Sequence, residues 1–179
     1  GEEEYSGKGV SYCATCDGPF FRGQNVVVVG GGDTALADAI YLSKLCKEVV
    51  IIHRRSTFRA QKALQEKIKS VSNISTLMGK NILEIKGNGS KVECVVLDDG
   101  SEIETNGVFV FVGTVPNSKI VEGIVKTENG FVLTDEKMNT SLPGLYAVGD
   151  VRNTSFRQVV TATGDGAKAA HSADEYIQE

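Results

Sequence analysis

The stretch NVVVVGGGDTA, residues 25–35, decides the fold of this 179-residue chain. Its first part, residues 25–29, is a short run of mostly β-branched apolar side chains, which is typical of a buried parallel strand. The run stops at three consecutive glycines, and residues 34–45 then carry apolar side chains at helical spacing, with no Gly or Pro among them. The stretch therefore predicts a strand, a tight glycine turn and a helix in immediate succession.

The glycine turn matches the dinucleotide-binding pattern G-x-G-x-x-A, from Gly30 to Ala35. Gly30 permits the tight turn, Gly32 lets the backbone approach a pyrophosphate, and Ala35 keeps the helix close to the strand. The N-terminus of the helix then faces the negative charge of the phosphates. A structural turn that binds no ligand is the alternative. The candidate cofactor-binding residues of the turn are Gly30, Gly31, Gly32, Asp33, Thr34 and Ala35.

A second apolar run, Glu48–Ile52, ends in a basic segment that indicates which dinucleotide is bound. NAD-binding folds place an acidic residue near this strand end, where it holds the ribose 2′-hydroxyl. This chain has three arginines there instead, and a guanidinium group binds phosphate through forked, charge-assisted hydrogen bonds. The segment therefore favours NADPH over NADH, with a solvated basic turn as the alternative. The candidates are His53, Arg54, Arg55 and Arg59, with Arg54 and Arg59 expected on the 2′-phosphate and Arg55 in support.

A cysteine pair, Cys13 and Cys16, precedes the nucleotide motif and is followed directly by Asp17. Two intervening residues allow a small redox disulfide, and this spacing can lower the pKa of one thiol. The alternatives are half of a zinc site, which needs about four ligands, or two inert buried thiols. Asp17 is a candidate proton donor to a thiolate, or else a solvated turn residue or helix cap. The other cysteines, Cys46 and Cys94, are single and far apart, so we expect no metal and expect both to stay reduced and largely buried.

The rest of the chain predicts further helices and strands that complete an α/β domain. The expected elements are a helix at 60–71, a third parallel strand at 74–77, an antiparallel meander at 81–86, 91–97 and 101–104, and a returning strand at 107–112. Turn signals at 87–89 and 98–100 separate the meander strands. We expect the meander to cover one face of the parallel sheet. The pattern breaks at residues 113–117, where we place a domain boundary, and a strand at 145–148 and a helix at 157–176 follow.

Composition excludes some functions and locations. A hydrophobic content of 41% supports a packed core, and a net charge of −4 without a long basic run argues against general nucleic-acid binding. No secretory signal or transmembrane run is evident. Four cysteines with one C-x-x-C pair suit a reducing compartment rather than a disulfide scaffold. We therefore expect a cytoplasmic protein with neither nucleic-acid nor membrane partners.

Taken together, these motifs resemble those of bacterial-type, low-molecular-weight thioredoxin reductases. The matching segments are CATCDG (13–18), GGGDTA (30–35), HRR (53–55) with FRA (58–60), GLYAVGDV (144–151) and RQVVTA (157–162). They follow one another in family order over nearly the whole chain. One small departure lies in the first helix, where the family often carries two acidic residues and this chain has Ala37 and Asp38.

The resemblance implies a relay of electrons from NADPH through FAD to the Cys13–Cys16 disulfide and then to thioredoxin. It assigns Cys16 to face the flavin, Cys13 to attack the disulfide of thioredoxin, and Asp17 to donate a proton. It also implies a homodimer and a rotation of two domains about hinges near residues 7–9 and 113–114. The implied FAD-binding residues are Gly149, Asp150, Arg157, Gln158 and Val159.

The same resemblance implies how the chain is divided. Residues 1–9 are expected to be a linker or hinge, residues 10–113 a Rossmann-like NADPH-binding domain with the cysteine pair, and residues 114–179 the C-terminal portion of an FAD-binding domain. Family members carry a further FAD-binding segment before the cysteine pair, so we expect this chain to be part of a longer enzyme. Two alternatives stay open: a related flavin disulfide reductase with another donor or acceptor, and a non-catalytic NADPH-binding module.

Overall fold

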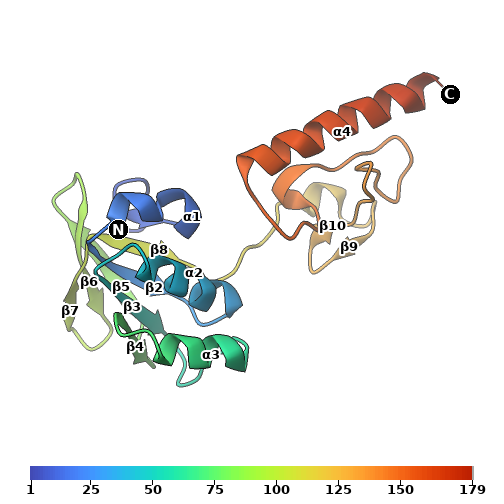
Figure 1. Cartoon of the computed structure of the whole chain (residues 1–179). Coiled ribbons are helices and arrows are strands. Elements are labelled where there is room, and N and C mark those ends of the chain that lie inside the picture. The colour runs from blue at the N-terminus through green and yellow to red at the C-terminus, as the bar shows by residue number, and fades with distance from the viewer. Residues whose placement is uncertain (179) are drawn as a thin grey trace. The chain divides into compact units, whose positions relative to one another are not determined.

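The computed structural model describes residues 1–178, which form two compact units. The first unit is Gly1–Gly113 and the second begins at Thr114 (Figure 1). The division falls at the start of the segment where the sequence pattern breaks. Each unit is described here by itself.

A parallel sheet forms the centre of the first unit. Within the described residues it has five strands in the order β1-β8-β2-β3-β4, and every neighbouring pair is parallel. The strands are β1 (Val10–Ser11), β2 (Asn25–Val29), β3 (Glu48–His53), β4 (Ile74–Met78) and β8 (Gly107–Val110). The valines of β2 lie between β3 and β8, with Val27 opposite Val50 on one side and Val108 on the other. This central position explains why the run is apolar on both faces.

Helices cover one face of this sheet (Figure 1). They are α1 (Ala14–Asp17), η1 (Gly18–Phe21), α2 (Asp33–Ser43) and α3 (Lys62–Lys69). Leu36, Ala39 and Leu42 of α2 are fully buried in a core with alternate side chains of the sheet.

Two helices, α2 and α3, are shorter than the sequence predicts. The α2 helix ends in a tight turn, in which the Leu45 N–H donates to the Leu42 carbonyl, and α3 begins only at Lys62 because the preceding residues bond to the glycine turn.

The expected meander covers the opposite face of the sheet (Figure 1). It consists of β5 (Ile82–Gly87), β6 (Val92–Leu97) and β7 (Glu102–Glu104), paired antiparallel in that order. Val92, Val95 and Leu97 of β6 form a second core with the inward side chains of β1, β2, β3 and β8. The predicted α/β architecture, with a parallel sheet and an antiparallel meander, is therefore confirmed.

The N-terminal residues expected to form a linker pack within the first unit. Tyr5 is 5% exposed and belongs to the second core, and the Tyr5 hydroxyl accepts a hydrogen bond from the Gly89 N–H. Gly9 has φ +131, and a Cβ there would lie 2.6 Å from the Val92 side chain. Residues 1–9 are thus an ordered part of this unit in the present conformation, and their role as a hinge stays a prediction.

The second unit has little regular structure apart from one long helix. Its elements are η2 (Lys119–Val121), β9 (Thr127–Glu128), β10 (Phe131–Val132), η3 (Gly149–Val151) and α4 (Val159–Gln178). The α4 helix begins two residues later than expected, because the Thr161 hydroxyl accepts the Gln158 N–H and caps the helix start. It continues through Gly164 and Gly166, as expected.

The buried strand predicted at residues 145–148 is wrong. Tyr146 makes a single antiparallel bridge to Asn139, and Val148 is 38% exposed. A strand is stable only where its backbone groups have ladder partners, and the described part of the chain provides no more than this one bridge. Separately, none of the helices in residues 1–178 is both long and apolar enough to span a membrane.

Candidate functional site: a disulfide and a nucleotide cleft

The cysteine pair forms a disulfide in this structure. Cys13 and Cys16 are bonded with their Cα atoms 5.3 Å apart, and the bond bridges the start of α1. Cys13 is half-buried and Cys16 is exposed, so the bridge is accessible to a reaction partner. Among the described residues, no cluster of three or more His, Cys, Asp or Glu side chains could hold a metal ion. The predicted Cys13–Cys16 disulfide is therefore present, whereas its redox role and the roles of the two sulfurs stay predictions.

The two other cysteines differ in their burial. Cys46 is buried, and burial raises the pKa of its thiol to about 11, which keeps it protonated and unreactive at neutral pH. Cys94 is only half-buried, so the expectation that it is largely buried is wrong. Cys94 lies on β6 one residue before the buried Val95, and alternate side chains of a strand point to opposite faces.

Asp17 is hydrogen-bonded to a residue that the sequence analysis missed. The Ser11 hydroxyl donates to the Asp17 carboxylate with an Oγ–Oδ2 distance of 2.7 Å, and the same hydroxyl accepts the Cys13 N–H at 3.1 Å. Ser11 is 4% exposed. Its position two residues before the cysteine pair is the only sequence signal that could have identified it. The hydrogen bond fixes the carboxylate on the turn that carries the disulfide.

The three glycines of the turn have different physical roles. Gly30 has φ +148, and a Cβ there would lie 2.4 Å from the Phe111 carbonyl oxygen. A Cβ on Gly31 would overlap the His53 ring at 2.4 Å, whereas a Cβ on Gly32 would meet nothing within 4 Å. Gly30 and Gly31 are therefore required by the packing of the protein itself. The space over Gly32, at the N-terminus of α2, is open, and the first N–H groups of a helix lack intrahelical partners, so this phosphate cradle is compatible with a bound pyrophosphate.

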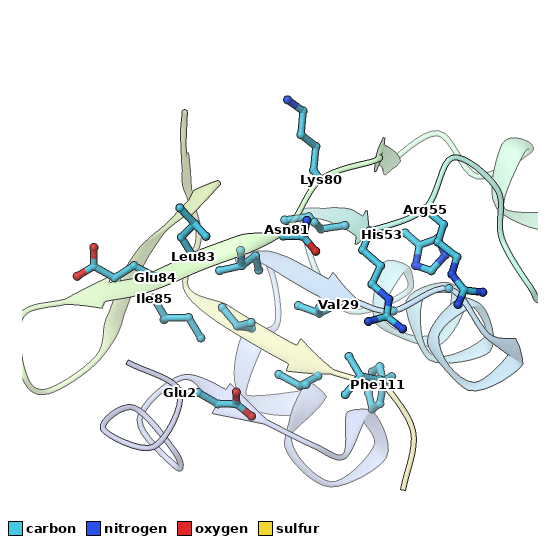
Figure 2. A pocket seen from close by; sticks show the side chains of 18 of the residues that line it. Glu2, Val29, His53, Arg55, Lys80, Asn81, Leu83, Glu84, Ile85 and Phe111 are labelled. Carbon is cyan, nitrogen blue, oxygen red and sulfur yellow. The ribbon is translucent and has the colours of Figure 1, made fainter. Parts of the chain in front are cut away.

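A cleft of about 710 Å³ begins at this turn. It lies at the carboxyl ends of β2, β3 and β8, the edge at which open parallel sheets bind ligands. Figure 2 shows His53 and Arg55 at one side of the cleft and Glu84 and Ile85 of β5 at the other. The site residues predicted from the sequence that line it are Gly30, Gly31, His53, Arg54, Arg55 and Arg59. The structure thus brings the glycine turn and all three arginines to one cleft.

His53 is the only one of these polar side chains that is buried, among the residues described. It is 7% exposed, its ring stacks on Phe58 with centroids 5.6 Å apart, and its Nε2 has no hydrogen-bond partner within residues 1–178. Burial lowers the pKa of His53, and the charges of the three arginines lower it further, against a hydrogen bond with the Thr57 backbone. The lowered pKa favours the neutral imidazole at pH 7, and the unpartnered Nε2 is buried against Gly31.

The arginine segment is tied to the glycine turn through the backbone. The Arg59 and Ala60 N–H groups both donate to the Gly31 carbonyl, at 2.8 and 3.1 Å. The next residue, Gln61, donates its N–H to Asp33 Oδ1 at 2.7 Å and its side-chain amide to Asp33 Oδ2 at 3.3 Å. Nothing in the local sequence indicates that Gln61 belongs to the site. The sequence predicts that Arg59 and Asp33 bind the cofactor, and the contacts of Asp33 in this structure are with Gln61.

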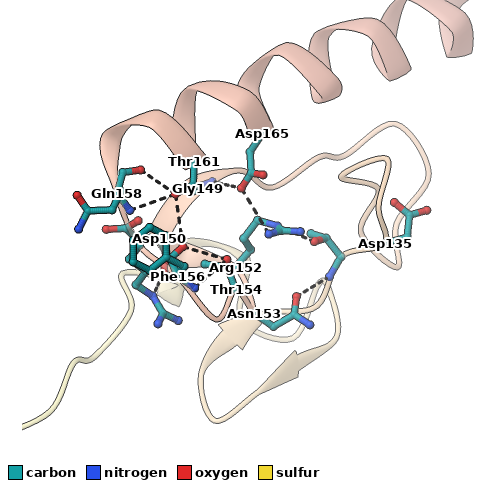
Figure 3. Close-up of polar contacts among 12 residues, drawn as sticks. Asp135, Gly149, Asp150, Arg152, Asn153, Thr154, Phe156, Gln158, Thr161 and Asp165 are labelled. Carbon is teal, nitrogen blue, oxygen red and sulfur yellow. Dashed lines mark hydrogen bonds and ion pairs between the residues drawn. The ribbon is translucent and has the colours of Figure 1, made fainter. Parts of the chain in front are cut away.

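The residues expected to bind FAD gather at the start of α4 in the second unit (Figure 3). The Gly149 N–H donates to Asp165, which also forms an ion pair with Arg152 at 3.4 Å. Asp150 is exposed, and its backbone carbonyl accepts a hydrogen bond from Arg157. The Arg157 guanidinium also lies over the Phe131 ring, 4.3 Å from its centroid. Of the remaining two predicted residues, Gln158 precedes α4 and Val159, which is 85% exposed, begins it.

Relatives of known identity match this chain along its whole length. A thioredoxin reductase of Listeria innocua is 46% identical over 100% of the chain and 58% of its own length. A thioredoxin reductase of Treponema pallidum is 47% identical over 99% of the chain and 59% of its own length. The crystal structure of thioredoxin reductase from Streptococcus pyogenes superposes with a TM-score of 0.94 and 42% identity, covering 99% of this chain and 60% of that one.

The chain therefore spans about three fifths of the length of these relatives. The family model described as pyridine nucleotide-disulphide oxidoreductase matches residues 1–166. That match includes the disulfide, the glycine turn and the arginine segment. The chain belongs to the pyridine nucleotide-disulphide oxidoreductase family and is similar along its whole length to bacterial thioredoxin reductases.

Proposed function

We propose that the protein containing this chain is an NADPH-dependent flavoprotein reductase whose substrate is the disulfide of thioredoxin. The observation that carries the proposal is the presence, in one unit, of an accessible disulfide and a cleft lined by Gly30 and Gly31 of the glycine turn and by three arginines. The names of the relatives support thioredoxin as the acceptor. Because the chain covers about three fifths of those relatives, the activity is proposed for the whole protein.

The nucleotide cleft supports NADPH as the electron donor. The turn at Gly32 offers space and unpaired N–H groups for the pyrophosphate, and Arg54 and Arg59 offer forked donors for the 2′-phosphate. The neutral His53 packs against Gly31 of the turn and adds no further charge to the cleft. FAD, when bound, supplies the two-electron carrier that links the nicotinamide to the disulfide. Gly149, Asp150, Arg157, Gln158 and Val159 would contribute to holding it, since they lie near the start of α4, where Asp150 and Val159 are exposed.

The cysteine pair passes two electrons on by thiol–disulfide exchange. The Cys13 thiolate attacks one sulfur of the thioredoxin disulfide, and the other sulfur of thioredoxin leaves as a thiolate that takes a proton from the protonated form of Asp17, which regains a proton from solvent. The Cys16 thiolate then attacks Cys13 in the mixed disulfide, which re-forms the Cys13–Cys16 bond and releases the second thioredoxin sulfur as a thiolate that takes a proton from solvent. In the balanced reaction, NADPH, one proton and one thioredoxin disulfide give NADP⁺ and two thioredoxin thiols.

The compartment and the assembly follow from the same proposal. A reductase that keeps a disulfide pair cycling with NADPH works in a reducing environment, so we place it in the cytoplasm. The resemblance to the family supports a homodimer. A net charge of −4 supports neither nucleic acid nor an anionic membrane surface as a partner.

The test is reduction of thioredoxin by the full-length protein, loaded with FAD and supplied with NADPH. Cys13→Ser and Cys16→Ser are each expected to abolish turnover, because each removes one of the two exchanging sulfurs. Cys46→Ser, which changes a buried and unreactive thiol, is the matched control and is expected to keep turnover. Turnover that survives both active-pair substitutions contradicts the proposed function.

A further inference from the structure

We propose that Asp33 is a positioning residue that fixes the arginine segment at the correct distance from the glycine turn, and that this sets the preference for a 2′-phosphorylated dinucleotide. The inference rests on the proposed binding of NADPH to this cleft. It assigns to Asp33 an action through Gln61 and Arg59 rather than a direct contact with the nucleotide. The evidence is a set of hydrogen bonds between two segments that are about 28 residues apart in the sequence.

The hydrogen bonds form a continuous clamp between the two segments. Three consecutive backbone N–H groups, those of Arg59, Ala60 and Gln61, point at acceptors on residues 31–33. The first two share the Gly31 carbonyl, and the third uses the Asp33 carboxylate at 2.7 Å. The hydrogen bond to the carboxylate is charge-assisted and is the shortest of the three, so it is also expected to be the strongest.

The clamp matters because the arginine side chains are exposed, and at this end of the segment the clamp supplements the packing of Phe58 and Ala60 and the hydrogen bond from the Gly79 N–H to the Arg55 carbonyl. Residues 54–57 and Arg59 are exposed, and Ala60 is the buried anchor at the end of the segment. In a 2′-phosphorylated dinucleotide the pyrophosphate and the 2′-phosphate are attached to the same ribose, so their separation has a limited range. The cradle at Gly32 and the guanidinium of Arg59 can bind both groups at once only if their separation is held. A site that is preorganised in this way avoids the entropic cost of ordering the segment on binding.

The charge of Asp33 allows the clamp to be distinguished from a direct electrostatic effect of the carboxylate on the nucleotide. A carboxylate in the first turn of α2, next to a phosphate cradle, repels a bound pyrophosphate through space. A purely electrostatic role therefore predicts that removal of Asp33 tightens NADPH and NADH alike. The clamp predicts the opposite for NADPH, because the 2′-phosphate alone depends on the arginine segment.

The experiment measures equilibrium binding of NADPH and of NADH to the 1–179 chain by calorimetry. We expect Asp33→Ala to raise the Kd for NADPH about fivefold, the equivalent of one hydrogen bond, and to leave the Kd for NADH unchanged or lower. Asp33→Asn removes the charge but keeps an oxygen that accepts the Gln61 N–H, so it is expected to retain most of the preference for NADPH. Gln61→Ala removes only the longer side-chain hydrogen bond and is expected to have a smaller effect than Asp33→Ala.

Amide hydrogen exchange gives a readout that does not depend on the nucleotide. The Gln61 amide is expected to exchange faster in Asp33→Ala than in Asp33→Asn, since only the alanine variant lacks the acceptor. Equal changes in the Kd values for NADPH and NADH, or an unchanged preference in Asp33→Ala, overturn the inference. If the unsubstituted chain itself shows no preference for NADPH over NADH, the proposed donor is wrong, and that result is distinct from the failure of the clamp.

Discussion

The buried hydroxyl of Ser11 joins the Asp17 carboxylate to the backbone of Cys13. It donates to Asp17 Oδ2 at 2.7 Å and accepts the Cys13 N–H at 3.1 Å. A hydrogen bond to a charged group contributes about 1.5–3 kcal/mol. The geometry therefore makes the orientation of the proposed proton donor depend on a residue outside the C-x-x-C motif.

Ser11→Ala is expected to slow thioredoxin turnover by the full-length protein about tenfold, because the hydrogen bond that orients Asp17 is removed. The variant should also change how the alkylation rate of the reduced cysteine pair depends on pH. Ser11→Thr, which retains a hydroxyl, is the matched control and should restore both properties in part. Identical turnover and identical pH profiles for the alanine variant and the unsubstituted protein would exclude this role.

The arginine segment should determine nucleotide preference. Replacing Arg54 and Arg59 with alanine is expected to weaken NADPH binding by about 1.5–3 kcal/mol for each charge-assisted hydrogen bond that is removed. NADH binding should barely change, since NADH carries no 2′-phosphate. Calorimetry on the 1–179 chain measures both constants, and Arg22→Ala, an exposed arginine elsewhere in the unit, controls for the change in net charge. Equal weakening for both nucleotides would contradict the assignment.

Neighbouring glycines of the turn should respond differently to the same substitution. Gly32→Ala adds a methyl group where nothing lies within 4 Å, so the free energy of unfolding should hardly change while NADPH binding falls. Gly31→Ala places a methyl group against the His53 ring at 2.4 Å, so it should destabilise the unit by about 1–3 kcal/mol, the usual cost of overpacking. Urea unfolding and calorimetry separate the two effects. The reverse order of stabilities would show that the turn is packed in another way.

The sequence predicts those parts of the site whose signals are local. The strand, turn and helix at residues 25–45 are recognisable because an apolar run, glycines and helical spacing follow one another directly. The disulfide is recognisable for the same reason. The pairing of Asp33 with Gln61 is not, since it joins exposed residues 28 positions apart and no periodic pattern marks it.

The burial of His53 and the absence of the strand predicted at residues 145–148 both depend on long-range contacts. His53 stands next to two arginines and looks like a surface residue, yet it is buried because its ring packs against Gly31 and stacks on Phe58. Residues 145–148 have the composition of a strand, but a strand also needs partners, and Asn139 provides a single bridge. Neither outcome can be read from the residues themselves.

Burial of His53 should make the stability of the first unit depend on pH. The pKa of His53 is lowered in the folded state from its ordinary value of 6.5, mainly by burial. Below pH 6.5 the unfolded chain therefore binds a proton that the folded chain resists, and stability should fall as the pH drops through this range. His53→Gln, which cannot titrate, should unfold with a weaker pH dependence between about pH 7 and 5. If the urea midpoints of the two proteins changed with pH by the same amount over this range, the prediction would be contradicted.

The 1–179 chain is expected to bind NADPH but not FAD. NADPH should bind, because the whole cleft of about 710 Å³ lies within the first unit. FAD should not bind with useful affinity, because its pyrophosphate and adenosine require a second glycine-rich turn between a strand and a helix, and residues 1–178 contain one such turn, at Gly30–Gly32. The second unit also leaves Val159, Val160 and Ile177 of α4 at 85%, 75% and 80% exposure, so an apolar surface is uncovered and the chain should self-associate. Calorimetric titration with FAD and sedimentation measure the two properties. Stoichiometric FAD binding by this chain would show that residues 149–159 suffice for the flavin and that no second phosphate turn is needed.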